Sequence, residues 1–269
     1  MKIILFSRRQ LSHTAAEICQ LFDALRLFGF DYAVNEEFAP LAEELTGIRI
    51  PPEKIYGQCT GKQPANSVMV CYGGDGTLLE GVHRLCGAPI PVMGINAGHL
   101  GFLTSAPSAG LNLIFKEIAE GRLTTEARSM IEVTGDYAEQ PDTTLALNEF
   151  TVQRHGAGMI SVETYVDDQM VATYHGDGVI FSTPTGSTAY SLSAGGPVVA
   201  PTCACLVISP LAPHNLTMRS VVIPDSSVIT LRVSKAEKSI FLVHFQNISF
   251  YDTLRNKMMW GIDSRDLVK

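Results

Sequence analysis

A chain of 269 residues, of which 46% are hydrophobic and 17% charged, is long enough for two domains and too apolar for a disordered protein. Its formal net charge of −7 argues against nucleic acid as the main partner, because binding a phosphate backbone requires a basic surface. No apolar run is as long as a membrane span, and the scattered cysteines lack zinc spacing, so we expect a cytoplasmic protein that does not bind membranes.

The first 125 residues are predicted to alternate strands with helices. The helix after the first strand starts at Thr14, whose spacing to Glu17 is that of a capping box. Such alternation favours parallel pairing in a Rossmann-like, doubly wound α/β domain, in which ligands bind at the carboxyl ends of the strands. Residues 35–66 give no firm pattern apart from a helical run at residues 40–45. The predicted strands are the apolar runs 2–6, 32–34, 68–72 and 91–95.

A glycine-rich turn, Gly73-Gly-Asp-Gly-Thr77, joins a buried strand to the next predicted helix. Glycine lets a ligand approach the backbone closely, and the N–H groups at a helix N-terminus bind phosphate. Asp75 adds a carboxylate from which a phosphate gains nothing, so we expect it to hold Mg²⁺ or to accept a proton from a hydroxyl. The alternative is a tight turn with an exposed Asp. The candidate phosphate-binding residues are Gly73, Gly74, Gly76 and Thr77.

Beyond Gly121 the pattern changes to many short strands and few helices, which predicts an all-β, sandwich-like domain over residues 126–250. Asp167-Asp168 is expected to form a hairpin turn between two of these strands. The tail 251–269 has a helical pattern and is expected to return to the first domain, 1–125. The predicted strands of the second domain cover residues 129–134, 144–153, 159–166, 170–174, 179–182, 206–209, 221–223 and 228–233.

A second candidate site follows one strand of the β domain, where Thr183-Pro-Thr-Gly186 leads into a short helix rich in small hydroxyl residues. With Tyr190 on that helix, the stretch offers backbone donors, hydroxyls and a ring, which suits a ligand with ribose hydroxyls and a flat base. The alternative, a glycine-rich turn capped by serine and threonine, leaves Tyr190 without a reason. Asn148-Glu149 is a third candidate, although Glu149 is equally consistent with a strand residue that faces solvent.

These motifs, in this order, resemble the NAD kinase family in its bacterial form, and the resemblance covers nearly the whole chain. It implies an α/β domain and a β domain with the active site between them. It further implies transfer of the γ-phosphoryl of ATP, or of polyphosphate, to the 2′-hydroxyl of the adenosine ribose of NAD, with a divalent metal such as Mg²⁺. The residues that carry the resemblance are Gly73–Thr77, Asn96–Phe102, Asn148-Glu149, Gly176–Ser191, Ala212–His214 and Leu254–Trp260.

The resemblance also implies roles for single residues. Asp75 is then the proton acceptor, and no residue is assigned to the metal. Members of the family are commonly dimers or tetramers, so we expect a homo-oligomer. The Asp-Gly-Gln hairpin that the family usually has after strand 228–233 is missing here. The implied NAD-binding residues are Asp75, Gly76, Phe102, Asn148, Glu149, His175, Asp177, Thr188, Ala189, Tyr190, Ser191, Leu192, Ser193 and Ala212.

Two alternatives to this function remain at the level of the sequence. Lipid and sugar kinases share the glycine-rich turn with its Asp, but the Thr188-Ala-Tyr190 segment separates them from an NAD kinase. A dinucleotide sensor without catalytic activity would bind NAD and give no turnover.

Overall fold

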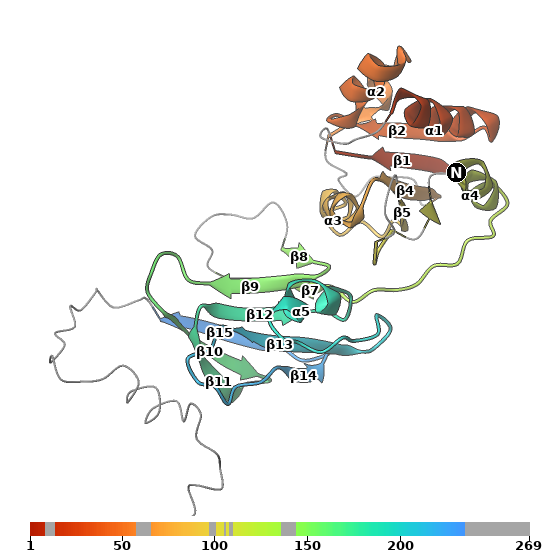
Figure 1. The fold of residues 1–269 in the computed structure, drawn as a ribbon. Helices are drawn as coiled ribbons and strands as arrows, with labels where there is room; N and C mark the ends of the chain where they lie inside the picture. Colours follow the sequence, from red (N-terminus) through yellow and green to blue (C-terminus); the bar gives the residue numbers. More distant parts are fainter. Residues whose placement is uncertain are drawn as a thin grey trace, which may run out of the picture.

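The computed structural model describes residues 1–8, 14–57, 66–96, 101–104, 106–107, 110–135 and 144–234. The chain forms an α/β part and a β part, connected by residues 122–130, which contain neither helix nor strand (Figure 1). We propose that the domain boundary lies in this segment, near residue 125. The expected return of the tail 251–269, and the stretch in which the family's hairpin is missing, lie outside the described residues.

The α/β part contains a six-stranded sheet in which every neighbouring pair is parallel, in the order β3-β2-β1-β4-β5-β6. The expected capping box of the first helix is present, since the Thr14 side chain accepts from the Glu17 N–H and the Glu17 carboxylate accepts from the Thr14 N–H. The strands are β1 (Lys2–Phe6), β2 (Asp31–Asn35), β3 (Ile55–Tyr56), β4 (Ser67–Tyr72), β5 (Val92–Asn96) and β6 (Ala106–Pro107). The helices are α1 (Ala15–Leu27), α2 (Phe38–Thr46), α3 (Asp75–Arg84), α4 (Leu111–Ala119) and the 3-10 turn η1 (Pro52–Lys54).

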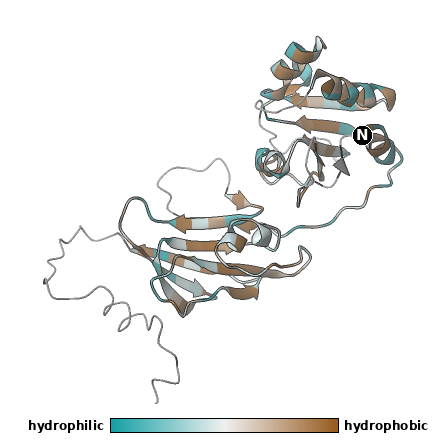
Figure 2. Cartoon of the chain, viewed as in Figure 1, coloured by the Kyte–Doolittle hydropathy of each residue, from teal (hydrophilic) through white to brown (hydrophobic). Residues whose placement is uncertain are grey.

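Both faces of this sheet are covered, as expected for a doubly wound fold. Because successive side chains of a strand point to opposite faces, Ile3 and Leu5 of β1 pack with helices α1, α2 and α4, whereas Ile4 and Phe6 pack with α3. Strand β1 is accordingly mostly hydrophobic along its length (Figure 2). Helix α3 therefore stands alone on its face of the sheet among the described helices, with its N-terminus at the carboxyl end of β4.

The β part contains two antiparallel sheets, β14-β13-β12-β9 and β11-β10-β15, and a small pair β7-β8. Val162 and Tyr174 of one large sheet share a buried cluster with Phe181 and Ile208 of the other, which makes the sandwich-like arrangement expected from the sequence. The strands are β7 (Ile131–Glu132), β8 (Leu145–Ala146), β9 (Glu149–Gln153), β10 (Ile160–Val166), β11 (Gln169–Gly176), β12 (Gly178–Ser182), β13 (Cys205–Leu211), β14 (Val221–Pro224) and β15 (Ile229–Ser234).

One strand prediction in this part is wrong. The run 144–153 is not a single strand but breaks into β8 and β9 at Leu147 and Asn148. The Asn148 carbonyl accepts the N–H of Thr183 at 2.9 Å, which extends the pairing of β9 with β12 by one residue. The hairpin prediction is correct, since Asp167 and Asp168 form the turn between β10 and β11 with φ of 49° and 63°. Within the described part of the chain, no helix is long and apolar enough to cross a membrane.

Candidate active site

The glycine-rich turn lies at the carboxyl edge of the parallel sheet, between β4 and α3, with Gly74 as the residue before the first turn of the helix. Gly73 has a φ of 151°, and a Cβ there would lie 2.5 Å from the Thr77 hydroxyl oxygen, so no other residue fits without displacing Thr77. The predicted strand-to-helix turn is therefore present, with the helix N-terminus open to an anion.

Asp75 does not point freely into solvent. Its Oδ2 accepts from the Phe102 N–H at 2.7 Å, and its Oδ1 accepts from the N–H of Leu103 at 3.1 Å and from the N–H and hydroxyl of Thr104, both at 3.0 Å. Gly101 is required beside it, because a Cβ at that position would overlap the carboxylate. The carboxylate thus fastens residues 101–104 to the first turn of α3.

The ionisation of Asp75 follows from these contacts. Burial by itself raises the pKa of the carboxyl group, but the hydrogen bonds from Thr104, Phe102 and Leu103 together hold the pKa below its ordinary value of 3.8. Asp75 is therefore a carboxylate at neutral pH. Its Oδ2 accepts one hydrogen bond from the described residues, and a carboxylate oxygen can accept two.

A cavity of about 440 Å³ lies between α3 and the β part. Arg8, Glu80 and His83 line its α/β side, and Asn148 and Glu149 line the opposite side. A second cavity of about 540 Å³, more apolar, adjoins it beneath residues 123–130, and Val82 and Leu147 line both. Two of the predicted NAD-binding residues, Asn148 and Glu149, thus line a cavity of the size that takes a small ligand, whereas none of the residues Gly73–Thr77 lines it.

Glu149 carries a buried carboxylate oxygen that has no hydrogen-bond partner among the described residues. It is the first residue of β9 and half-buried, and the oxygen without a partner is its Oε2. Burial raises the pKa of its carboxyl group. Since a buried polar oxygen without a partner is costly, hydroxyl groups of a ligand in the cavity would stabilise it.

The Thr183–Gly186 stretch is tied to the same break in the chain. The Thr183 hydroxyl donates to the Leu147 carbonyl at 2.6 Å and accepts from the Gly186 N–H at 3.1 Å. Leu147 also packs against the cluster of Ile4 and Phe6 in the α/β part. Leu147 therefore contacts the core of the α/β part through its side chain and accepts the Thr183 hydroxyl through its carbonyl. It directly precedes Asn148 in the sequence.

The short helix α5 (Tyr190–Ser193), which follows the 3-10 turn η3 (Thr185–Thr188), presents most of its residues to solvent. Tyr190 is 41% exposed, and its hydroxyl accepts from the Gln153 side-chain amide at 2.8 Å. Ser191 is buried and shares a hydrogen bond of 3.0 Å with Ser209, which fixes the helix on β13. The accessible residues of the predicted dinucleotide segment are Thr188, Ala189, Tyr190, Leu192 and Ser193.

Three predicted site residues form a separate cluster. The Asp177 N–H donates to the Leu211 carbonyl next to Ala212, and the His214 N–H donates to the His175 carbonyl at 2.7 Å. The Asp177 carboxylate pairs with Arg154 at 2.6 Å. This cluster is at the start of β12, whereas Glu149 pairs with Ser182 at the end of that strand, about 13 Å away at 3.3 Å per residue.

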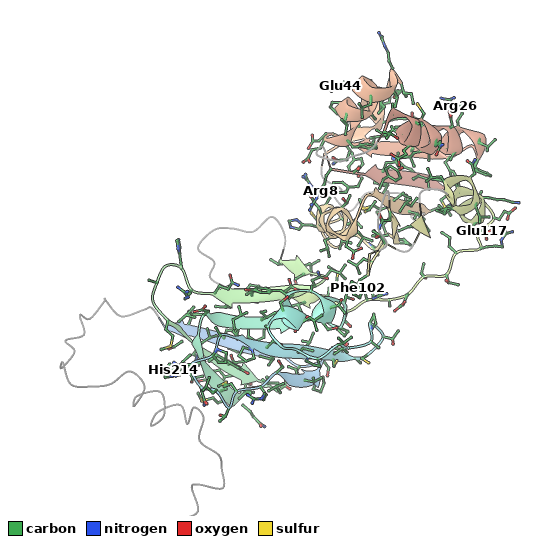
Figure 3. The ribbon with its side chains drawn as sticks, viewed as in Figure 1. Arg8, Arg26, Glu44, Phe102, Glu117 and His214 are labelled. Carbon is green, nitrogen blue, oxygen red and sulfur yellow. The ribbon has the colours of Figure 1, made fainter. Side chains whose placement is uncertain are left out.

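The figures agree with this separation. Phe102, which is 78% exposed, lies on the side of the α/β part that faces the β part, whereas His214 lies at the far side of the β part (Figure 3). The structure therefore brings Asp75 together with Phe102, and Asn148 with Glu149 and the Thr183–Gly186 stretch. It does not bring His175, Asp177 and Ala212 to the same cavity within one chain.

Sequence reasoning missed Arg8 and Glu80, which line the cavity from the α/β part. A signal for Arg8 was available, because it follows β1 at the same edge of the sheet as the glycine-rich turn. The sequence contains no comparable signal for Glu80, because an acidic residue on a helix ordinarily faces solvent.

A glycine-rich turn with a carboxylate at a helix N-terminus, in a chain whose two parts enclose a polar-lined cavity, is typical of a phosphotransferase. Residues 53–123 match the family model described as the ATP-NAD kinase N-terminal domain, and residues 147–257 match that of the C-terminal domain. The NAD kinase of Flavobacterium psychrophilum is 33% identical over 295 residues, which cover 99% of this chain and 100% of that protein. The chain belongs to the NAD kinase family.

Other relatives are consistent with this membership. The NAD kinase of Cytophaga hutchinsonii is 38% identical over 226 residues, covering 74% of this chain and 77% of that protein. The crystal structure of an NAD kinase from Archaeoglobus fulgidus in complex with ATP matches with a TM-score of 0.65 and 26% identity, covering 90% of this chain and 87% of that one. The yeast NADH kinase complexed with NADH has the same fold, with a TM-score of 0.71 and 23% identity over 87% of this chain and 74% of that one. A lipid or sugar kinase is not favoured.

Proposed function

We propose that the chain transfers the γ-phosphoryl group of ATP to the 2′-hydroxyl of the adenosine ribose of NAD, in a site between its two parts. The observation that carries this proposal is the cavity lined by Arg8 and Glu80 on one side and by Asn148 and Glu149 on the other. The donor phosphates would lie on the Gly73–Thr77 turn, and the dinucleotide along β9 and α5. Positioning and charge neutralisation account for most catalysis of phosphoryl transfer, which suits such a divided site.

The acceptor side of the proposal rests on polar groups that face the cavity or solvent. The unpartnered oxygen of Glu149 would accept from a ribose hydroxyl, with Asn148 beside it. Asp75 would accept the proton of the attacking 2′-hydroxyl. Gly76 and Phe102 next to it, together with the accessible residues of η3 and α5, would shape the rest of the NAD-binding surface.

Metal dependence is part of the proposal. Within the described ranges, no three His, Cys, Asp or Glu side chains gather as metal ligands, and the Asp75 oxygens are already hydrogen-bonded. The residues present therefore do not form a protein-built metal cage. Mg²⁺ commonly binds through substrate phosphates with few protein ligands, so we propose that it arrives bound to the donor, and we assign it no residue.

The decisive experiment measures NADP formation by the purified chain. NAD, ATP and Mg²⁺ are expected to give NADP, and polyphosphate replaces ATP in a parallel reaction to define the donor. NAD binding with neither donor giving NADP would instead identify a non-catalytic dinucleotide sensor. If the chain neither forms NADP nor binds NAD, the proposed function is contradicted altogether.

Tyr190 tests the dinucleotide side. Tyr190→Ala is expected to raise KM for NAD by about ten- to hundredfold, because losing an aromatic contact to a base costs ~1–3 kcal/mol. KM for ATP should change much less, since the donor would be held in the other part. Tyr190→Phe is the matched control, which keeps the ring and removes only the hydrogen bond from Gln153. Equal losses for both substrates, or a large drop in Tm, would make Tyr190 a packing residue.

We also propose a homo-oligomer, a dimer or tetramer, in which the cluster of His175, Asp177 and Ala212 reaches the dinucleotide from a second copy. Its support is the distance of this cluster from Glu149 and the apolar side chains exposed on strands at sheet edges. Those side chains are Met170 and Val171 on β11, Val221 and Val222 on β14, and Val233 on β15. Light scattering is expected to give a mass of at least two chains, and a monomer at assay concentration would contradict it.

A cytoplasmic location also remains a proposal. Its support is that the described cysteines are free thiols, namely Cys19, Cys71, Cys86, Cys203 and Cys205.

A further inference from the structure

Arg8 stands directly beside the glycine-rich turn. Its Nε donates to Glu80 Oε2 at 2.5 Å, and a Cβ built on Gly76 would lie 3.2 Å from its Nη1 and 3.7 Å from its Nη2. The outer edge of the guanidinium group is therefore against the first turn of α3. Figure 3 shows Arg8 at this place, beside α3 and away from Arg26 on α1.

A chain of ion pairs holds Arg8 there. Glu80 uses its second oxygen to bind Arg84 at 3.5 Å, and Arg84 binds Glu37 at 2.6 Å. In this run of ion pairs, Glu80 and Glu37 are each paired with an arginine. Arg8 is the terminal member of the run and lies against the glycine-rich turn. Glu80 takes the Nε–H, and among the described residues no acceptor is recorded for the other four N–H groups of the guanidinium, which can bind an acceptor from the cavity side.

We propose that Arg8 binds the terminal phosphates of the donor. The inference rests on the proposed function. A guanidinium group presents paired N–H donors that match two phosphate oxygens, and it stays charged at every working pH. Negative charge on the transferred phosphoryl group is spread over its outer oxygens in the transition state, where a fixed cation beside the Gly76 backbone would neutralise it. Glu80 is then the positioning residue for Arg8.

The competing explanation is an ordinary surface ion pair. The Arg8 side chain is 47% exposed, and exposed ion pairs contribute little to stability. Arg26 offers a matched control, because it lies in the same part of the chain, pairs with Asp23 at 3.3 Å and is 75% exposed, but is far from the turn. If both arginines are only surface pairs, replacing either one has the same small effect.

The test compares Arg8→Gln, Arg8→Lys and Arg26→Gln. Arg8→Gln is expected to raise KM for ATP by about ten- to hundredfold, because a charge-assisted hydrogen bond to the donor is lost. KM for NAD and Tm should stay near those of the parent. KM for ATP of Arg8→Lys should lie between those of the parent and Arg8→Gln, because lysine keeps the charge and loses the paired donors. Arg26→Gln should match the parent in every measurement.

Binding of inorganic triphosphate, measured by calorimetry, keeps the test independent of turnover. Weaker binding by Arg8→Gln than by Arg26→Gln supports the inference even if the parent forms no NADP, an outcome that would remove the proposed function alone. Equal triphosphate binding by the two variants, or an equal rise in both Michaelis constants for Arg8→Gln, would overturn the role of Arg8 while leaving an active NAD kinase in place.

Discussion

Replacing Asp75 with asparagine is expected to lower kcat at least ~100-fold, the usual scale for the loss of a general base. The asparagine amide cannot accept a proton from the 2′-hydroxyl. The substitution also removes the negative charge that attracts this proton. The effect should appear in kcat more than in KM for ATP, because the backbone N–H groups of the turn remain. Steady-state kinetics on the purified, folded variant measure it. Turnover close to that of the parent would remove Asp75 from the chemistry.

The same substitution should also affect stability, since the carboxylate accepts from three backbone N–H groups. An asparagine has an NH₂ group in place of one acceptor oxygen, so one of these donors is left facing another donor. Because the folded pKa is lowered, the stabilisation is present above pH 3.8 and is lost as pH falls through the folded pKa. The two proteins should therefore differ in Tm at pH 7 and converge in acid.

Thr104→Val is the control that separates the two effects. It removes the Thr104 hydroxyl bond to Asp75 but leaves the carboxylate and its backbone donors in place. A loss of Tm with kcat largely retained is expected. If Thr104→Val lowers kcat as much as Asp75→Asn does, the shape of the 101–104 segment, and not the carboxylate, sets the rate.

Gly186→Ala is expected to have the second largest effect. The new Cβ would overlap the carbonyl oxygen of Asn148 and lie 2.8 Å from its Cα, so backbone must move against backbone. Overpacking of this kind costs about 1–3 kcal/mol, which is several degrees in Tm for a chain of this size. Because Asn148 precedes Glu149, KM for NAD should rise at least about tenfold, equivalent to ~1.4 kcal/mol.

Gly110→Ala provides the comparison for this variant. Gly110 also has a negative φ, of −107°, and no atom lies within 4 Å of the position that its Cβ would take. Tm and both Michaelis constants should stay near those of the parent. Gly186→Ala with unchanged NAD kinetics would mean that the contact between the two motifs does not position the dinucleotide site.

The sequence predicted most of what local patterns determine. Continuous apolar runs identified β1, β4 and β5 as strands covered on both faces, and the spacing of Thr14 and Glu17 identified the start of α1. The glycine-rich turn was located correctly because its residue types permit few other structures. Of residues 35–57, the sequence predicted only the helical run 40–45, which lies inside α2, because α2 lacks a side-chain cap and β3 has only two residues.

What local patterns could not predict depends on contacts between distant residues. Arg8 meets Glu80 across 72 positions of sequence, and the Thr183 hydroxyl bonds the Leu147 carbonyl at the break between β8 and β9. The separation of Asp177 from Glu149 follows from antiparallel register, since residues at the two ends of β12 cannot share one cavity. The resemblance named candidate residues but not which of them meet within one chain.

The position of Leu147 has an energetic consequence. It packs on the α/β core and accepts the Thr183 hydroxyl, and the next residue faces the ligand cavity. Docking of the two parts and occupation of the cavity are therefore linked equilibria, and linkage is reciprocal. Whatever factor a bound ligand adds to the docking constant, docking adds to the ligand affinity, so the contact of Leu147 with the α/β core contributes to the affinity of the cavity that it lines.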